Sequence, residues 1–159
     1  MTFEELGIKE PLRKAVEELG FEHPMPVQER VIPHLLDPEK DGDVVALAQT
    51  GTGKTAAFGL PVLQRINSEI NRPQALILSP TRELCLQIAS DLADFSKYMP
   101  DVRVLPVYGG SSIESQIRAL REGVQVIVAT PGRLIDLINR GVVKLDEVHT
   151  VILDEADEM

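Results

Sequence analysis

Residues 44–55 decide the fold, and they read Val44-Val45-Ala46-Leu47-Ala48-Gln49-Thr50-Gly51-Thr52-Gly53-Lys54-Thr55. The first five side chains are all apolar, which predicts a short buried strand. A glycine-rich stretch follows, ends in Lys-Thr, and leads into a helical pattern. A strand, a glycine-rich turn and a helix in this order are the context that a phosphate-binding loop requires.

The residue types in this loop suit a nucleoside triphosphate. Gly51 and Gly53 let backbone N–H groups point at phosphate oxygens, and the helix N-terminus adds a partial positive charge. Lys54 can reach the β- and γ-phosphates, and Thr55 can place its hydroxyl on Mg²⁺. The alternative is a glycine-rich turn with an incidental lysine, which strand, spacing and helix together disfavour. We expect the nucleotide to contact Ala48, Gln49, Thr50, Gly51, Thr52, Gly53, Lys54 and Thr55.

Short apolar runs and helical patterns alternate through the rest of the chain. Two helices are predicted before the loop, around Leu12–Leu19 and around Val31–Leu35, and residues 37–43 form a polar turn. Further strands are predicted at Ala75–Ser79, Val102–Val107, Val126–Ala129 and Val148–Leu153, with helical patterns at Leu84–Phe95 and Leu134–Ile138. This alternation predicts an α/β fold, a mostly parallel sheet with helices on both faces. Ligands of such sheets bind at the carboxyl ends of the strands.

The last strand-like run ends in acidic residues, Asp154-Glu155-Ala156-Asp157. One carboxylate at a strand end can hold Mg²⁺ through its water shell, and the next can polarise an attacking water. We assign Asp154 to the metal, together with Thr55, and Glu155 to the base, so that the expected catalytic residues are Lys54, Asp154 and Glu155. An acidic cluster after a strand is more often a solvated terminus, but the phosphate-binding loop upstream reverses that preference.

Composition restricts the function less than the motifs do. The 159 residues carry a net charge of -9, which argues against a broad basic surface but allows a local phosphate-binding groove. The single Cys85 fits a reducing compartment and reads as a small buried side chain. The first ten residues lack the apolar segment of a signal peptide, and no run approaches the ~18 apolar residues of a membrane span. We therefore expect a cytoplasmic protein with no membrane contact.

Along its whole length the chain resembles the DEAD-box RNA helicases, because the motifs of that family occur in the family's order. The sequence Asp-Glu-Ala-Asp at 154–157 gives that family its name, and the loop at 48–55 matches the variant typical of helicases. The remaining motifs are the Q motif at Gly20-Phe21 and Pro24–Gln28, motif Ia at Pro80–Leu84, the GG motif at Gly109-Gly110, and motif Ib at Thr130–Arg133. Met25 stands where the family usually has Thr.

The resemblance implies a RecA-like P-loop NTPase fold, ATP and Mg²⁺ as cofactors, and RNA as partner. The Gln28 amide would pair with the donor and acceptor edge of adenine, while Phe21 either stacks on the base or packs in the core. The implied contacts with RNA phosphates and sugars are Pro80, Thr81, Arg82, Gly109, Gly110, Thr130, Gly132 and Arg133. Such contacts read backbone shape and not base sequence. Taken singly, Arg82 and Arg133 would be ordinary surface arginines.

The resemblance also implies an incomplete molecule. Residues 1–36 would be a Q-motif helical segment within the same structural domain as residues 37–159, a partial N-terminal RecA-like domain. A second RecA-like domain, which carries arginine fingers, would be absent. In the family a later strand lies between the phosphate-loop strand and the acidic strand. We therefore expect a gap of roughly 10 Å between those two strands, with self-association of the chain as one way to fill it.

The expected function is the ATP-binding and RNA-backbone-binding part of a bacterial RNA-dependent ATPase that unwinds short RNA duplexes. The chain alone would bind nucleotide without efficient turnover, since arginine fingers are worth ~10³–10⁵ in rate. Two alternatives stay open: a non-catalytic nucleotide- or RNA-binding module, and a P-loop enzyme of another class.

Overall fold

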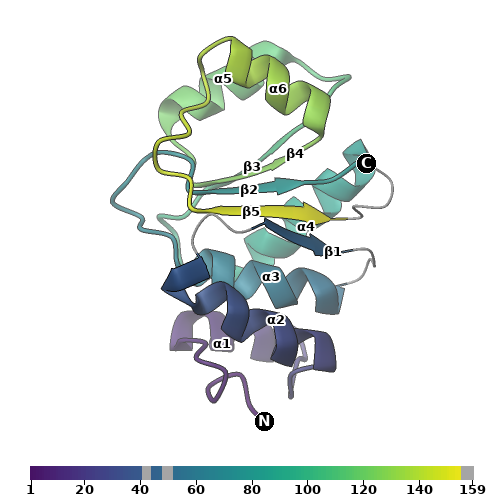
Figure 1. The fold of residues 1–159 in the computed structure, drawn as a ribbon, viewed down its shortest axis with the longest axis vertical. Coiled ribbons are helices and arrows are strands. Elements are labelled where there is room, and N and C mark those ends of the chain that lie inside the picture. The colour runs from purple at the N-terminus through teal and green to yellow at the C-terminus, as the bar shows by residue number, and fades with distance from the viewer. Residues whose placement is uncertain (41–43, 48–51, 155–159) are drawn as a thin grey trace.

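Five parallel strands form one sheet in the order β1-β5-β2-β4-β3 (Figure 1). The computed structural model describes residues 1–40, 44–47 and 52–154, and at 40, 44–47 and 52 it describes the backbone alone. The strands are β1 Val44–Leu47, β2 Ala75–Leu78, β3 Val104–Val107, β4 Val126–Ala129 and β5 Thr150–Asp154. The helices are α1 Glu10–Glu18, α2 Pro26–Leu36, α3 Thr52–Gln64, α4 Arg82–Phe95, α5 Ile113–Glu122 and α6 Pro131–Asn139, with a 3-10 turn, η1, at Pro38–Lys40.

Helices cover both faces of the sheet. The helices α3 and α4 lie on one face, with α1 and α2 packed outside them, and α5 and α6 lie on the other (Figure 1). The first face builds the larger core, in which Phe3, Leu12 and Ile32 from the N-terminal segment join Phe58 and Phe95. The second core is smaller and includes Ile127 of β4 and Leu137 of α6. The predicted α/β class is confirmed.

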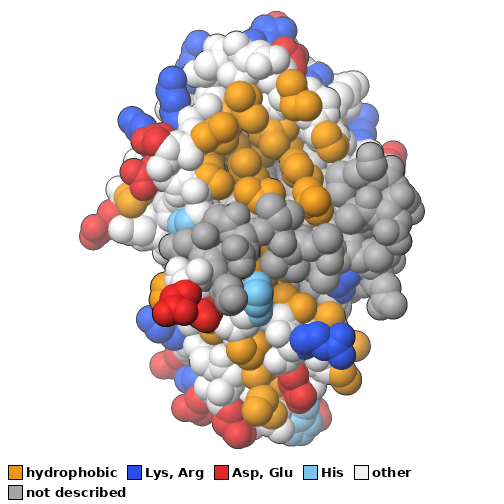
Figure 2. All heavy atoms as spheres, viewed as in Figure 1, with side chains coloured by type: hydrophobic (Ala, Val, Ile, Leu, Met, Phe, Trp, Pro, Cys, Tyr) orange, Lys and Arg blue, Asp and Glu red, His pale blue; other side chains and the backbone are white. Residues whose placement is uncertain are grey.

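The second face is the less completely covered. Burial along β5 alternates, so that Ile152 faces the larger core with no exposure while Val151 and Leu153 are half-buried. Figure 2 shows hydrophobic side chains gathered at the surface in the upper half of the molecule, where Figure 1 places the sheet below α5 and α6.

The expected gap between the phosphate-loop strand and the acidic strand is absent, so that prediction was wrong. The strands β1 and β5 pair directly, with Val44 opposite Val151 and Leu47 opposite Asp154. An unpaired strand edge leaves backbone N–H and C=O groups without partners. Direct pairing satisfies those groups along the facing sides of the two strands, and it removes the gap for which self-association was expected.

Other differences from the predicted elements are local. The strands β2 and β3 are shorter than predicted, and β5 begins at Thr150 and includes Asp154. The helix α2 begins at Pro26, before the helix predicted around Val31–Leu35, because proline is tolerated in the first turn of a helix. The helix α5 was not predicted, although Ser112 caps it by accepting a hydrogen bond from the Ser115 N–H at 3.3 Å.

Candidate functional site

The first part of the site is the meeting point of α3 and β5. Lys54, in the first turn of α3, forms an ion pair through its Nζ atom with Oδ1 of Asp154, the last residue of β5. Both residues are almost fully buried, with exposed fractions of 6% and 1%. The lysine predicted to bind phosphate and the acidic strand end therefore meet, and direct pairing of β1 and β5 brings the ends of these two strands side by side. Predicted site residues Ala48, Gln49, Thr50, Gly51 and Glu155 lie outside the described residues, as does the side chain of Thr52.

Burial makes this ion pair energetically sensitive. Two charges removed from water are stable only when they compensate one another, and loss of one partner leaves an uncompensated buried charge. Lys54 and Asp154 are also the groups predicted to hold the phosphates and the metal. The ion pair thus joins the two groups that the sequence assigns to phosphate and to metal.

Thr55 contacts a carboxylate that the sequence did not single out. Its hydroxyl donates to Asp91 on α4, and Gln87 Nε2 donates to Asp91 Oδ1 at 3.0 Å. Burial raises the pKa of Asp91, and these two hydrogen bonds act in the opposite direction. A hydroxyl that donates its proton keeps its lone pairs, so this contact is compatible with a metal on Thr55. Mg²⁺ usually takes one or two protein carboxylates plus phosphate oxygens, and the Thr55 and Asp154 oxygens fit that donor set.

Gln28 ties the Q-motif segment to the phosphate-binding loop. It is fully buried, its Oε1 accepts from the Met25 N–H at 2.8 Å, and its Nε2 donates to the Gly53 carbonyl at 2.9 Å. The Met25 side chain also lies against Gly53, where an added Cβ would overlap its Sδ atom. An amide has two N–H donors and two acceptor lone pairs. Gln28 therefore keeps hydrogen-bonding capacity for a nucleobase while it holds the Gly53 carbonyl.

Phe21 packs in the core. It is half-buried, lies against the larger core, and meets Phe95 edge to face, with ring centroids 6.5 Å apart and planes at 71°. This contact favours the core-packing alternative, and stacking of Phe21 on a base stays a prediction.

The second part of the site surrounds the loop between β3 and α5. The guanidinium of Arg82, the first residue of α4, lies over the Tyr108 ring with Cζ 5.0 Å from the ring centroid. Its Nη1 atom would be 3.9 Å from a Cβ added to Gly110, whose φ of +84° favours glycine. Arg82 and Gly109 are both exposed. The predicted motif Ia and GG residues therefore lie side by side.

Arg133 lies against the same loop. Its Nη1 donates to Oε1 of Gln116 at 2.9 Å, and Nη1 and Nη2 both reach the Ser111 carbonyl, at 3.4 and 3.3 Å. Gln116 in turn donates from Nε2 to the Tyr108 carbonyl at 3.3 Å and to Ser111 Oγ at 3.0 Å. Motif Ib is therefore joined to the GG loop through one side-chain amide.

The other predicted RNA contacts lie at helix N-termini on this edge of the sheet. Thr81 is the N-cap of α4 and accepts the Leu84 N–H at 3.2 Å, which gives it a structural role. Thr130 is the N-cap of α6, and Gly132 is exposed in its first turn. Pro80 is half-buried just before α4. Helix N-termini favour anions, so their position suits phosphate.

Sequence reasoning missed Tyr108, Gln116 and Asp91. Gln116 lies in the unpredicted helix α5, and a glutamine among charged residues reads as solvated surface. Asp91 lies on the amphipathic helix α4, where an acidic residue is normally expected on the solvent side. It is nevertheless only 8% exposed. Only Tyr108, directly before Gly109-Gly110, carried a signal, since an aromatic residue beside a glycine pair is a platform for a cation.

Cys85 is buried with no exposure, and burial raises the pKa of its thiol to about 12. The thiolate is the reactive form of cysteine. The interpretation of Cys85 as a small core side chain is therefore confirmed.

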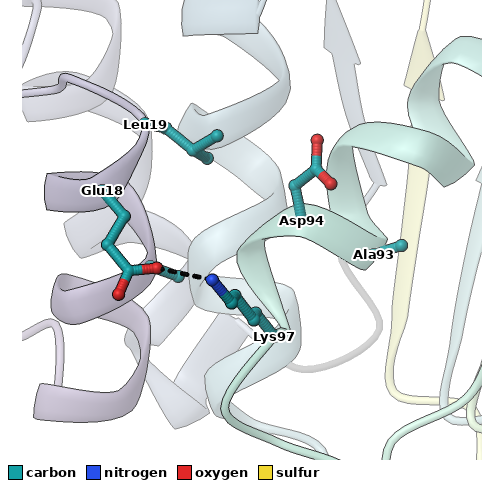
Figure 3. Close-up of a pocket in the computed structure, with 6 residues that line it drawn as sticks. Glu18, Leu19, Ala93, Asp94 and Lys97 are labelled. Carbon is teal, nitrogen blue, oxygen red and sulfur yellow. Dashed lines mark hydrogen bonds and ion pairs between the residues drawn. The ribbon is translucent and has the colours of Figure 1, made fainter.

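A separate hollow lies where α1 and α4 end (Figure 3). Glu18 and Lys97 form an exposed ion pair across it at 2.9 Å, and Leu19 and Ala93 line its sides. A hydrogen bond from Tyr98, followed by one from Lys97, lowers the pKa of Glu18. Because α4 starts at Arg82 and ends at Phe95, this hollow lies at the opposite end of that helix from Arg82.

Two features are absent from the described residues. Among them, no three His, Cys, Asp or Glu side chains gather in a way that could hold a metal ion. Within the same ranges, no helix has both the length and the apolarity needed to cross a bilayer.

Known proteins resemble this chain in sequence. The family model for the DEAD/DEAH box helicase matches residues 25–159. The ATP-dependent RNA helicase DeaD of Escherichia coli K12 is 51% identical over 158 residues, which is 99% of this chain and 25% of that protein. The DEAD-box ATP-dependent RNA helicase CshA of Geobacillus kaustophilus is 52% identical over 158 residues, 99% of this chain and 33% of that protein. The chain thus spans a quarter to a third of the length of these relatives.

Solved structures resemble it in fold. A DEAD box protein from the hyperthermophile Methanococcus jannaschii superposes with a TM-score of 0.87 at 40% identity, covering 100% of this chain and 42% of that one. Dbp5 of Saccharomyces cerevisiae, bound to RNA and ADP BeF3, superposes with a TM-score of 0.86 at 37% identity, covering 99% and 39%. With the family model matched from the Q motif to the last residue, this chain belongs to the DEAD/DEAH box helicase family.

Proposed function

We propose that this chain is the ATP-binding and RNA-backbone-binding part of an RNA-dependent ATPase that unwinds short RNA duplexes. The observation that carries the proposal is the meeting of Lys54 with Asp154 at the carboxyl end of the sheet. The two arginines, Arg82 and Arg133, lie along the same edge, after β2 and β4. Dbp5, which shares the fold at 37% identity, is a protein solved with RNA and ADP BeF3 together.

In the proposed mechanism, ATP replaces the protein's own ion pair. Lys54 moves from Asp154 to the β- and γ-phosphates, and Asp154 is then available, with Thr55, to hold Mg²⁺. When bound, Mg²⁺ neutralises charge on the phosphate oxygens. Glu155 orients the attacking water and accepts its proton. The loop residues 48–53 supply backbone N–H groups to the phosphates, and Gln28 selects adenine through its remaining hydrogen-bonding capacity.

The RNA contacts in this proposal are electrostatic and sequence-independent. Arg82 and Arg133 donate to phosphates, and the N-termini of α4 and α6, with Thr81, Thr130 and Gly132, add backbone donors. Gly109 and Gly110 carry no side chain, so the RNA strand can approach the protein backbone closely at these two residues. A protein of net charge -9 can bind RNA in this way because Arg82 and Arg133 lie along one edge of the sheet.

We further propose that residues 1–36 and 37–159 act as one structural unit, and that turnover requires a second RecA-like domain. That domain would supply arginine fingers, worth ~10³–10⁵ in rate. The chain alone would then bind nucleotide without efficient hydrolysis. ATP and RNA are both present in the cytoplasm, which is where we expect the protein to act.

The test compares ATP hydrolysis, with and without single-stranded RNA, in this chain and in a longer protein that contains it. We expect slow hydrolysis by the chain alone under both conditions and strong acceleration by RNA in the longer protein. Hydrolysis that RNA never accelerates would contradict the helicase proposal. Binding of both ligands without hydrolysis in the longer protein would favour the alternative, a non-catalytic binding module.

A further inference from the structure

The Gln116 side chain occupies the centre of the second part of the site. It is 5% exposed, although it lies on a helix whose neighbouring polar residues, Ser115 and Arg118, are exposed. Its amide uses both ends: Nε2 donates to the Tyr108 carbonyl and to Ser111 Oγ, and Oε1 accepts from Arg133. A buried amide with both ends engaged fixes the groups around it, because any rotation breaks several hydrogen bonds at once.

Through these contacts Gln116 reaches both arginines of the site. Arg133 is held directly, by the 2.9 Å hydrogen bond. Arg82 is held indirectly, since its guanidinium lies over the ring of Tyr108, whose carbonyl Gln116 binds. Residues 82 and 133 are far apart in sequence and follow different strands. Their relative position therefore depends on the loop between β3 and α5, and that loop depends on Gln116.

The chemistry of the acceptors preserves positive charge. Arg133 is held by an amide oxygen and a backbone carbonyl, and Arg82 by an aromatic face. All three are neutral, so they orient the guanidinium groups without cancelling their charge. A guanidinium has five N–H donors, and the contacts described for Arg133 use three. Arg133 is thus fixed in direction and still able to bind an anion.

We propose that Gln116 is a positioning residue that sets Arg82 and Arg133 as a pair for two phosphates of an RNA strand. This inference rests on the proposed RNA-binding function and assigns a role to a residue outside the family motifs quoted above. It acts through the two arginines and the Tyr108–Ser111 loop, and none of its hydrogen bonds within the described residues reaches the nucleotide site.

The test uses Gln116→Glu and Gln116→Met in this chain, with a fluorescein-labelled single-stranded oligouridylate as the probe. Anisotropy titrations at several salt concentrations give the RNA affinity and its salt dependence, and ADP titrations follow the nucleotide site. Gln116→Glu places a carboxylate on Arg133 and removes the donor to Tyr108. We expect at least tenfold weaker RNA binding and a salt slope reduced by about 1. Gln116→Met should weaken RNA binding about fivefold, and neither variant should change ADP affinity.

The matched control is Gln125, a buried amide at the opposite edge of the sheet. It is 1% exposed and accepts the Arg103 N–H at 2.8 Å. Gln125→Met and Gln125→Glu remove a similar buried amide and add the same charge, so they measure what loss of structure alone does. They should lower thermal stability and leave RNA affinity within about twofold.

A double-mutant cycle separates positioning from folding. In an Arg133→Ala background the effect of Gln116→Glu should shrink to a few-fold, because the group that it neutralises is gone. An undiminished effect in that background, or RNA binding unchanged in both Gln116 variants, would overturn the inference. If both variants lose ADP binding through unfolding, Ser111→Ala replaces them, with an expected loss of about threefold; no loss would then overturn it.

The outcome for the wild-type chain distinguishes this inference from the proposed function. Absence of RNA binding by the wild-type chain at low salt, or binding that Arg82→Ala and Arg133→Ala both leave intact, would refute the RNA site itself. RNA binding that depends on both arginines but not on Gln116 would refute only the positioning role.

Discussion

The two parts of the site hold their positive charges in opposite ways. At the nucleotide side Lys54 is paired with a carboxylate, and both groups are almost fully buried. At the RNA side Arg82 and Arg133 are held by neutral groups, an aromatic ring, a carbonyl and an amide. The carboxylate neutralises the charge of Lys54, whereas the neutral partners leave the charges of Arg82 and Arg133 available to an anion.

The difference shows how a phosphate site can be prepared in two ways. A lysine in a buried ion pair must exchange its partner for the ligand, and the carboxylate thereby released suits a cation. An arginine held by neutral acceptors can take a phosphate without losing its existing contacts. Under the proposed function, the first design would link phosphate binding to metal binding, and the second would give the chain a standing affinity for phosphate backbones.

The largest effect that this comparison predicts is for Lys54→Ala. It leaves the Asp154 carboxylate buried without its partner, so we expect a loss of roughly 3–5 kcal/mol in the free energy of unfolding, measured by urea denaturation. ATP affinity should fall at least tenfold while adenosine affinity does not change, because only the phosphate contact is lost. Replacing both partners, Lys54→Met with Asp154→Leu, should recover much of the stability. A stability loss below about 1 kcal/mol for Lys54→Ala would contradict the buried pair.

The next effect concerns Arg82→Ala and Arg133→Ala. Because neutral groups hold these arginines, no buried charge is left behind, and we expect each variant to lose no more than about 1–2 kcal/mol of stability. RNA affinity should fall about tenfold for each, with the salt slope reduced by about 1, and ADP affinity should be unchanged. A stability loss for Arg133→Ala as large as that for Lys54→Ala would break the comparison.

Gln28→Ala tests the link between the Q motif and the phosphate-binding loop. It removes the part-buried hydrogen bonds to the Met25 N–H and the Gly53 carbonyl, which costs about 1–3 kcal/mol. The preference for ATP over GTP should relax, as competition titrations would measure. Gln74→Ala is the control, because Gln74 is equally buried at the other edge and bonds Asn67 and Ile70. If Gln28→Ala and Gln74→Ala show the same preference for ATP over GTP, Gln28 does not recognise adenine.

The smallest expected effect comes from protonation of His149. This residue directly precedes β5, at the other end of that strand from Asp154. Burial, and then the charge of Arg65, lower the pKa of His149 from its ordinary value of 6.5. The folded state therefore binds protons less readily than the unfolded state. This contribution to stability is fully present above pH 6.5 and is lost as the pH falls through the folded-state pKa. Melting temperatures measured through that window should fall less for His149→Gln than for the wild type, and equal falls would exclude His149 as the cause.

What the sequence could predict was local. The phosphate-binding loop, most of the strands and the acidic strand end follow from contiguous residue patterns, and their meeting at one edge follows from the rule for parallel sheets. Strand order does not follow from any such pattern. The family resemblance placed another strand between β1 and β5, whereas the two pair directly.

What the sequence could not predict depends on tertiary contacts. Gln116 and Asp91 are polar residues on amphipathic helices, and nothing in their spacing shows that they are buried. Gln116 becomes informative only when Tyr108, Ser111 and Arg133 are seen around it. The same holds for Phe21. Whether it packs in the core or stacks on a nucleobase could be judged only from its contact with Phe95.

Under the proposed function, the ion pair between Lys54 and Asp154 would also have a kinetic consequence. A ligand that must wait for this pair to separate cannot associate faster than the separation itself. Observed association rates for ATP should then level off at high ATP concentration, whereas those for RNA, which meets guanidinium groups already in place, should rise in proportion to RNA concentration.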